Sequence, residues 1–280
     1  MSIITAGIDV GSTYTKAVVL GEGGRILGVD LRPTGFCLEE AAVASYRAAI
    51  AEAGLKDGDV AYVASTGYGR FQVPFRDLHV TDLTAAARGA RLLFPGTRTV
   101  LDIGGQTMKA SRLDERARVK AFRLNDKCAA GTGAFVEKAA RYLGFGTEEI
   151  GPLAATAKTP VPISGVCAVF AESEVINHVS TGAAPADIIQ GAILSLTDRA
   201  VQLLRRVQME PEFTLVGGIL RFETMVTAMR EKLPGRVNVP AGDQVQRVAA
   251  LGAAWLSQQR WAALRARGLA RERGAARVEA

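Results

Sequence analysis

The sequence is poor in the residues that mark several common classes of protein. Its 280 residues include three cysteines and two histidines, and aromatic residues make up 6%. No CxxC pair is present to indicate a structural zinc site. No GxxxxGK[ST] motif is present either, which excludes a P-loop nucleotide-binding protein. The stretch GEGGRILG resembles a dinucleotide fingerprint, but it joins two predicted strands instead of opening a helix, so we reject that interpretation.

Long apolar runs are also missing. No run approaches the length of a membrane span, and the opening stretch MSIITAGIDVG enters a predicted strand at once. We therefore expect a cytoplasmic protein with no membrane partner, in which Cys37, Cys128 and Cys167 form no disulfides. The net charge of +6 is concentrated at one end, because six arginines and two glutamates give +4 between Ser257 and Ala280. No recognition motif accompanies this basic tail, so nucleic acid is not an expected partner.

An internal repeat predicts the fold. The stretches ITAGIDVGSTYTKAVVL and RTVLDIGGQTMKASRL share an apolar run, an aspartate, a Gly-containing turn and a return strand. Asp9 and Asp102 take equivalent positions, and the alternating residues after each turn predict a hairpin. A third strand is expected after each hairpin, in RILGVDLRP and ARVKAFRLN, and helices follow, such as 37–55. The pattern predicts two duplicated α/β domains with a cleft between them.

The domain boundary is expected near FPGTRT, where Pro95 and Gly96 end an Ala-rich helical pattern. We expect one domain over residues 1–96 and a second over 97–245. A final helix over 246–280 is expected to pack back on the first domain.

The matched Asp-Gly turns predict a site for a nucleotide and Mg²⁺. Glycine lets backbone N–H groups approach phosphates closely. Hydroxyl groups and a lysine supply further hydrogen-bond donors, and carboxylates hold Mg²⁺ directly or through its waters. Gln106 stands where a side chain would orient an attacking water. The full set is Asp9, Gly11, Ser12, Thr13 and Lys16 in the first turn and Asp102, Gly104, Gly105 and Gln106 in the second. Hairpin geometry alone explains one such turn, whereas the matched pair favours phosphate.

A third Gly-containing turn lies in FTLVGGILRFETMVTAM, residues 213–229. An apolar strand, a Gly-Gly turn and an amphipathic helix are predicted there. Gly217 and Gly218 would let an adenine and ribose lie against the backbone. The motif is common and carries weight only beside the two Asp-Gly turns.

In order and spacing, GIDVGSTYTK, LDIGGQTMK and LVGG resemble the first phosphate, second phosphate and adenosine motifs of one superfamily. This is the actin-like, ribonuclease H-like ATPase superfamily of acetate kinase, Hsp70 and actin. The resemblance implies two α/β domains around a nucleotide cleft that takes ATP or ADP with Mg²⁺.

Two cysteines fall outside those motifs. In NDKCAAGTGAF and GVCAVFAESEVINHV, Cys128 and Cys167 each come just before a helical pattern, whose N-terminus favours the thiolate. Gly131 and Gly133 allow a tight entry into the first helix, where N–H groups would hydrogen-bond the sulfides of a cluster. Glu172 is a candidate general base or relay for the ATPase. The two thiols are either small buried hydrophobes or half of a four-thiolate site completed by a second subunit.

The segments NDKCAAGTG and CAVFAESEVI resemble signatures of the BadF/BadG/BcrA/BcrD-type ATPases. These are the ATPase subunits of benzoyl-CoA reductase and the activators (component A) of 2-hydroxyacyl-CoA dehydratases, and the resemblance runs from residue 4 to about 257. It implies a homodimer or heterodimer of related ATPase subunits, bridged by one [4Fe–4S] cluster on Cys128 and Cys167 of each. It also implies ATP-driven transfer of low-potential electrons from ferredoxin or flavodoxin to acyl-CoA-reducing partner subunits.

Within that family, LVGGILRFETM looks more like the delta-type subunit of benzoyl-CoA reductase than the TGGVAQN of the activators. We therefore expect an ATPase subunit of the dearomatising benzoyl-CoA reductase of anaerobic aromatic degradation. A 2-hydroxyacyl-CoA dehydratase activator is the alternative. A small-metabolite kinase and a chaperone-like ATPase on the same fold are more distant ones, and neither explains the paired cysteines.

Overall fold

The computed structural model describes residues 3–125, 132–164 and 168–270, the side chains of 168–172 excepted. The chain forms two compact units. Unit 1 comprises Met1–Gly96, Asp114–Val119 and Gln246–Ala280, and unit 2 comprises Thr97–Leu113 and Lys120–Val245.

The two units contain sheets of the same design. The sheet of unit 1 has the order β3-β2-β1-β4-β5, and the second sheet, read in the same sense, has the order β8-β7-β6-β9-β10. In both, the first strand pairs antiparallel with the next strand along the chain and parallel with a strand that comes later. The strands are β1 Thr5–Val10, β2 Tyr14–Leu20, β3 Ile26–Pro33, β4 Tyr62–Thr66, β5 Leu78–His79, β6 Thr99–Ile103, β7 Met108–Leu113, β8 Val119–Asn125, β9 Phe213–Val216 and β10 Val237–Asn238. The repeat in the sequence is therefore a repeat in strand topology.

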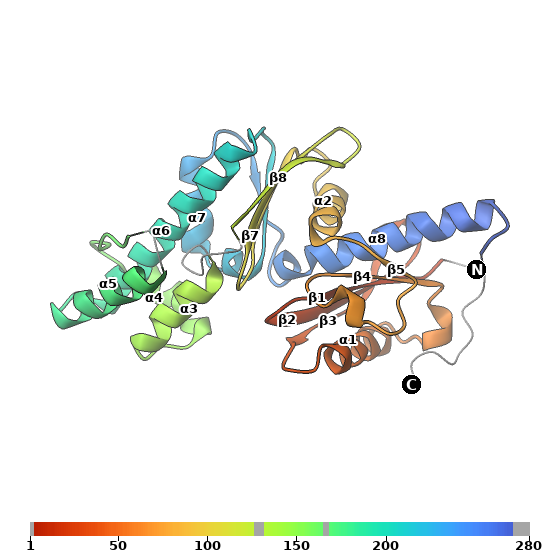
Figure 1. Cartoon of the computed structure of the whole chain (residues 1–280), viewed down its shortest axis with the longest axis horizontal. Helices are drawn as coiled ribbons and strands as arrows, with labels where there is room; N and C mark the ends of the chain where they lie inside the picture. Colours follow the sequence, from red (N-terminus) through yellow and green to blue (C-terminus); the bar gives the residue numbers. More distant parts are fainter. Residues whose placement is uncertain (1–2, 126–131, 165–167, 271–280) are drawn as a thin grey trace. The chain divides into compact units, whose positions relative to one another are not determined.

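Helices cover both faces of the sheet in unit 1 (Figure 1). Side chains alternate along β2, so that Ala17 and Val19 pack toward α1 (Leu38–Glu52), whereas Val18 and Leu20 pack toward α8 (Gln244–Ala266). Helix α2 (Asp82–Leu93) lies against α8 on that second face. The result is a three-layer α/β/α unit.

Helix α8 packs against its neighbours at very short range. A Cβ added at Gly252 would lie 1.8 Å from the carbonyl oxygen of Ala85, so only glycine permits this approach of α8 to α2. The hydroxyl of Thr5 also donates to the carbonyl of Ala254, at 3.1 Å. The helix ends at Ala266, before the turn at Gly268 with its positive φ of 67°, and so is shorter than the 246–280 that we expected.

The helices of unit 2 share an apolar core with its sheet. Helix α6 (Pro185–Arg206) is the longest and buries a continuous row of apolar residues against β7, α3 and α7. Leu101 and Ile103 of β6 point into this core, so the strand that ends at the second Asp-Gly turn is fixed by packing. The other helices are α3 Gly133–Tyr142, α4 Ile150–Ala154, α5 Ala168–Ser180 and α7 Glu223–Lys232.

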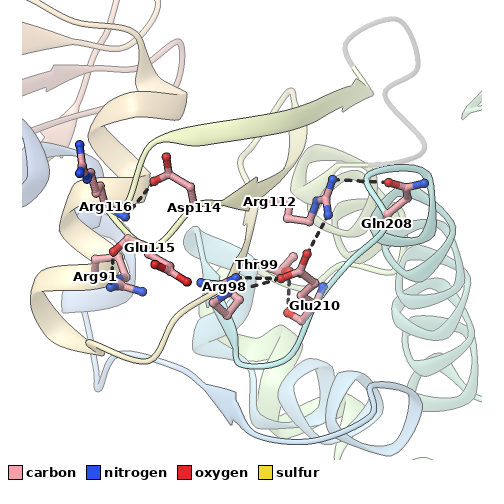
Figure 2. A network of polar contacts seen from close by, with 9 residues as sticks. All are labelled: Arg91, Arg98, Thr99, Arg112, Asp114, Glu115, Arg116, Gln208 and Glu210. Atoms are coloured by element: carbon pink, nitrogen blue, oxygen red, sulfur yellow. Dashed lines mark hydrogen bonds and ion pairs between the residues drawn. The ribbon is translucent and has the colours of Figure 1, made fainter.

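A polar network supports the far end of the β6–β7 hairpin in unit 2 (Figure 2). Arg112 and Arg98 donate to the two carboxylate oxygens of Glu210, at 2.7 and 3.2 Å. These two arginines, Arg112 first, lower the pKa of Glu210. The hydroxyl of Thr99 donates to the carbonyl of Glu210, at 2.7 Å.

The tip of the β7–β8 hairpin belongs to unit 1. The carboxylate of Asp114 accepts from the backbone N–H groups of Arg118 and Arg116, both at 2.9 Å, and from the Arg118 guanidinium (Figure 2 shows the contact with Arg116). These hydrogen bonds lower the pKa of Asp114 to about 2. Arg91 of α2 donates to the carbonyl of Glu115 at 3.0 Å, so the tip is hydrogen-bonded to a helix of the same unit.

The predicted strands and helices around the motifs are confirmed. The third strands are β3 and β8, the helix expected over 37–55 is α1, and Cys37 is its exposed N-cap residue. The stretch after β9 forms a short 3₁₀ turn, Gly218–Arg221, and then α7. Among the described helices, none has both the length and the apolar content needed to cross a membrane.

Candidate functional site

The first Asp-Gly turn joins β1 to β2. Asp9 pairs with Lys16 across the hairpin, and the lysine Nζ lies 3.0 Å from Asp9 Oδ2. The carboxylate is buried among unit 1 residues, with 7% of Asp9 exposed. Gly11 closes the turn by donating to the carbonyl of Tyr14 at 3.1 Å, and a Cβ there would lie 2.7 Å from the same oxygen. The turn itself therefore requires glycine, and the carboxylate-lysine pair is the stronger functional signal.

The second turn, between β6 and β7, repeats this geometry. Asp102 pairs with Lys109 in the same hairpin register, with the lysine Nζ 4.0 Å from Asp102 Oδ2. Gly104 donates to the carbonyl of Thr107 at 2.8 Å, as Gly11 does to Tyr14. We assigned no role to Lys109 from the sequence, although both motifs place a lysine seven residues after the aspartate. The repeat was the signal that would have found it.

The remaining turn residues are open to solvent. Ser12, Thr13 and Gln106 are exposed, and Gly105 is half-buried beside Gln106. Each turn thus presents backbone and side-chain donors next to a carboxylate that has a lysine beside it. Carboxylate oxygens suit Mg²⁺, and lysine and N–H donors suit phosphate, so the residues present fit a magnesium nucleotide.

A glycine with positive φ follows the parallel neighbour of each first strand. Gly217, after β9, has a φ of 107°, and a Cβ there would lie 2.2 Å from the carbonyl oxygen of Ile103. Gly67, after β4, has a φ of 87°, and its Cβ would lie 2.4 Å from Oδ1 of Asp9. Gly218, half-buried, follows Gly217 at the start of the 3₁₀ turn. We did not predict a role for Gly67, because its motif STGYG lacks the Gly-Gly pair that marks Gly217.

The start of α3 is hydrogen-bonded to the second turn. The N–H of Gly133 donates to the carbonyl of Gly104 at 3.1 Å, and the N–H of Ala134 donates to the carbonyl of Gly105 at 2.9 Å. Thr132, the N-cap residue, is completely buried. We expected backbone N–H groups at this helix entry to hydrogen-bond the sulfides of a cluster, and those of Gly133 and Ala134 are directed to the turn.

Residues 158–164, which precede α5, are hydrogen-bonded to side chains of α5 and α6. The carboxylate of Glu174 in α5 accepts from the N–H of Ser164, and Nε2 of His178 lies 3.1 Å from the carbonyl oxygen of Pro162. The carboxylate of Asp187 in α6 accepts from the N–H groups of Lys158 and Thr159, at 2.7 and 2.8 Å. From the sequence we named Glu172 in this region and not Glu174, whose role depends on a backbone contact ten residues away.

Several predicted site residues lie outside the described residues. These are Cys128, Gly131 and Cys167, and the side chain of Glu172 is outside them as well. Their flanks are described, because α3 begins five residues after Cys128 and α5 begins directly after Cys167. Phe135 and Val136 of α3 share a core with Val175 of α5. Within the described ranges, no group of three or more His, Cys, Asp or Glu side chains is arranged to hold a metal ion.

Two α/β units of the same topology, with an Asp-Gly-Lys turn in each, define the class of protein as one of actin-like fold. Residues 6–257 match the family described as the BadF/BadG/BcrA/BcrD ATPase family. The chain belongs to this family.

Named relatives are similar over most of their length. An activator of lactoyl-CoA dehydratase from Anaerotignum propionicum is 40% identical over 250 residues, which are 89% of this chain and 95% of the relative. A benzoyl-CoA reductase subunit from Thauera aromatica is 39% identical over 238 residues, 82% of this chain and 83% of the relative. A solved structure of the activator of the 2-hydroxyisocaproyl-CoA dehydratase from Clostridium difficile, with bound ADPNP, has a TM-score of 0.87 and 34% identity. The matched region covers 97% of this chain and 100% of the chain in that solved structure.

Proposed function

We propose that the protein is the ATP-hydrolysing activator of an acyl-CoA dehydratase, and that it delivers low-potential electrons to that partner enzyme. The matched Asp-Lys turns support ATP as the energy source. The 40% identity to an activator of lactoyl-CoA dehydratase supports the dehydratase as partner. This choice reverses the preference that the segment LVGGILRFETM suggested, because the similarity of the whole chain to activators outweighs one segment.

In this proposal both turns act on the phosphates of ATP. Asp9 and Asp102 hold Mg²⁺ directly or through its waters, because hard cations prefer carboxylate oxygens. Lys16 and Lys109 balance the charge of the phosphates when Mg²⁺ takes up the carboxylates. Glycine N–H groups and the exposed hydroxyls bind the phosphate oxygens. The residues of this last set are Gly11, Ser12, Thr13, Gly104 and Gly105.

The other nucleotide roles are those that the sequence motifs suggest. Gln106, exposed in the second turn, orients the attacking water. Glu172 in α5 is the alternative base or relay. Gly217 and Gly218 let the adenine and ribose lie against the backbone, because glycine has no side chain.

Cys128 and Cys167 are the proposed ligands of a [4Fe–4S] cluster shared with a second ATPase subunit. Two thiolates supply half of a four-thiolate set, and the helices next to both cysteines share one core in unit 2. The residues of the chain therefore fit a bridging cluster. When bound, the cluster supplies a one-electron carrier between a ferredoxin or flavodoxin and the acyl-CoA enzyme.

The ATPase subunit of benzoyl-CoA reductase is the second candidate. It is favoured by 39% identity to the benzoyl-CoA reductase subunit of Thauera aromatica and by the segment LVGGILRFETM. The two candidates share the nucleotide site and the cysteines and differ in the partner enzyme.

The test of the proposed function begins with anaerobic purification, which is expected to yield a brown protein with about two iron atoms per chain. A spectrum before and after dithionite distinguishes this protein from a kinase or a chaperone-like ATPase. The protein is then combined with 2-hydroxyacyl-CoA dehydratase or with the benzoyl-CoA-reducing subunits, and ATP-dependent turnover is measured. Turnover only with the dehydratase supports the proposal, and turnover only with benzoyl-CoA supports the second candidate. A Cys128→Ala protein with its full iron content would rule out the shared cluster.

A further inference from the structure

The second phosphate turn and the start of α3 are joined through two consecutive peptide groups. The carbonyl of the Gly104–Gly105 peptide accepts from Gly133, and the carbonyl of the Gly105–Gln106 peptide accepts from Ala134, at 3.1 and 2.9 Å. These two donors are the first residues of α3, whose N–H groups have no acceptor within the helix. The turn therefore caps the helix with its own backbone.

Each of these peptide groups also has an N–H that points away from α3. A trans peptide is planar, and its N–H and C=O point in opposite directions. The N–H groups of Gly105 and Gln106 therefore face away from the carbonyls that hold α3. Neither N–H has a hydrogen-bond partner among the described residues. In the proposed function, this is the side on which the phosphates bind.

The first turn has a different arrangement at the equivalent carbonyl. The carbonyl of Gly11, which corresponds to Gly104, accepts from the hydroxyl of Thr34 at 2.8 Å. Thr34 follows β3 and precedes α1 by several residues, so no helix begins on the first turn. The direct attachment of a helix is a property of the second turn.

We infer that these two peptide groups link nucleotide binding to the position of α3. The inference rests on the proposed function and names the contact through which the nucleotide acts. When phosphates bind the N–H side of the two planes, any rotation of the planes moves the carbonyls on which α3 begins. The phosphates thereby set the position of the first turn of α3.

Position 133 allows this link to be broken selectively. It is the first residue of α3, where proline suits a helix, and Thr132 before it is extended (φ −140°, ψ 165°), as a residue before proline should be. Gly133→Pro removes the N–H and places its ring against the Gly104 carbonyl, which separates helix and turn. Gly133→Ala is the matched control, because it keeps the N–H and its Cβ would lie 3.4 Å from that carbonyl.

The experiment measures hydrogen–deuterium exchange of α3 in the full-length protein, with and without saturating Mg²⁺ and ADPNP. In the wild type and Gly133→Ala, the nucleotide is expected to slow exchange in the first turn of α3 at least tenfold. In Gly133→Pro, the change should fall below twofold. Thr34→Val, which removes the equivalent contact of the first turn, should keep the full response of α3.

Two results would overturn the inference. One is that the nucleotide slows exchange in α3 equally in Gly133→Pro and Gly133→Ala. The other is that the nucleotide does not change exchange in α3 of the wild type. Loss of nucleotide affinity in Gly133→Pro alone would support the link, because coupling between two sites is reciprocal. If Gly133→Pro does not fold, Ala134→Pro removes the second bond and takes its place. Iron content is measured on the same samples, so a protein without a cluster refutes the proposed function while the exchange data still test the link.

Discussion

The β1–β2 and β6–β7 turns have the same local design and different neighbours. Each has an aspartate at the end of a buried strand, a lysine opposite it, and a glycine that closes the turn. In unit 1, the carbonyls around the turn are occupied by Thr34 and by the N–H of Gly69. In unit 2, the equivalent turn holds the start of α3. The duplicated sequence thus preserved the part that suits a nucleotide, while the surrounding chain gave each copy a separate structural role.

The largest expected effect follows removal of either carboxylate. Asp9→Asn and Asp102→Asn should each reduce ATP hydrolysis on the order of 100-fold, since the loss of a carboxylate at a metal-phosphate site costs about 3 kcal/mol in the transition state. Steady-state phosphate release measures this. Asp30→Asn is a suitable control, because Asp30 binds Arg32 on β3 outside the turn. A variant of either turn with the wild-type rate would show that only the other turn serves hydrolysis.

The next effect concerns the two glycines with positive φ beside the turns. Gly67→Ala and Gly217→Ala should each lower the free energy of unfolding by about 2–4 kcal/mol, because the backbone is strained and the new Cβ meets an oxygen. Chemical denaturation measures the change. Gly144 has a φ of 84°, and a Cβ added there would meet no atom within 4 Å. Gly144→Ala should therefore lower the free energy of unfolding by only about 1 kcal/mol. Equal losses at all three positions would mean that close approach to the turns contributes nothing.

The lysines allow a finer comparison of the turns. Lys16→Met and Lys109→Met should each weaken ATP binding about tenfold, as expected for the loss of one charged hydrogen bond. Lys16→Met should cost more stability, because Asp9 is buried and 3.0 Å from its lysine, whereas the contact of Asp102 with Lys109 is 4.0 Å. Calorimetric titration and thermal unfolding measure the two effects. Unchanged affinity in Lys109→Met alone would show that the second lysine serves only the fold.

The smallest expected effect is the change in stability with pH that comes from one carboxylate in each unit. Glu210 of unit 2 has a lowered pKa, so it stabilises the folded state above its unfolded value of 4.5, and this contribution is lost as the pH falls below that value. Asp114 of unit 1 has a pKa lowered from 3.8 to about 2, so its contribution is lost only between those values. Urea unfolding from pH 7 to pH 2 measures both.

In Glu210→Gln, the fall in stability just below pH 4.5 should become shallower. In Asp114→Asn, the fall in stability should become shallower only between pH 3.8 and about 2. Identical pH profiles for the two variants would contradict the assignment of these carboxylates to their arginine partners.

Most elements near the site were predictable because their signals are local. The alternation in β2, the Asp-Gly turns and the helical pattern that became α1 are contained in short stretches of sequence. The contacts of Glu174 and Gly67 were missed because they depend on backbone groups that only the folded chain brings near. The extent of α8 was overestimated because an Ala/Arg-rich pattern has no clear stop before Gly268.

The sequence by itself determined the repeated hairpins, the aspartates with a lysine seven residues later, and the two cysteines before helical segments. These follow from residue identity and short spacing, which fix turn chemistry and the face of a strand. Only the tertiary structure decided that Gly133 and Ala134 bind the carbonyls of the second turn, about thirty residues away in the chain. No local pattern encodes such a contact, because it exists only when β6 and α3 are packed against the same core.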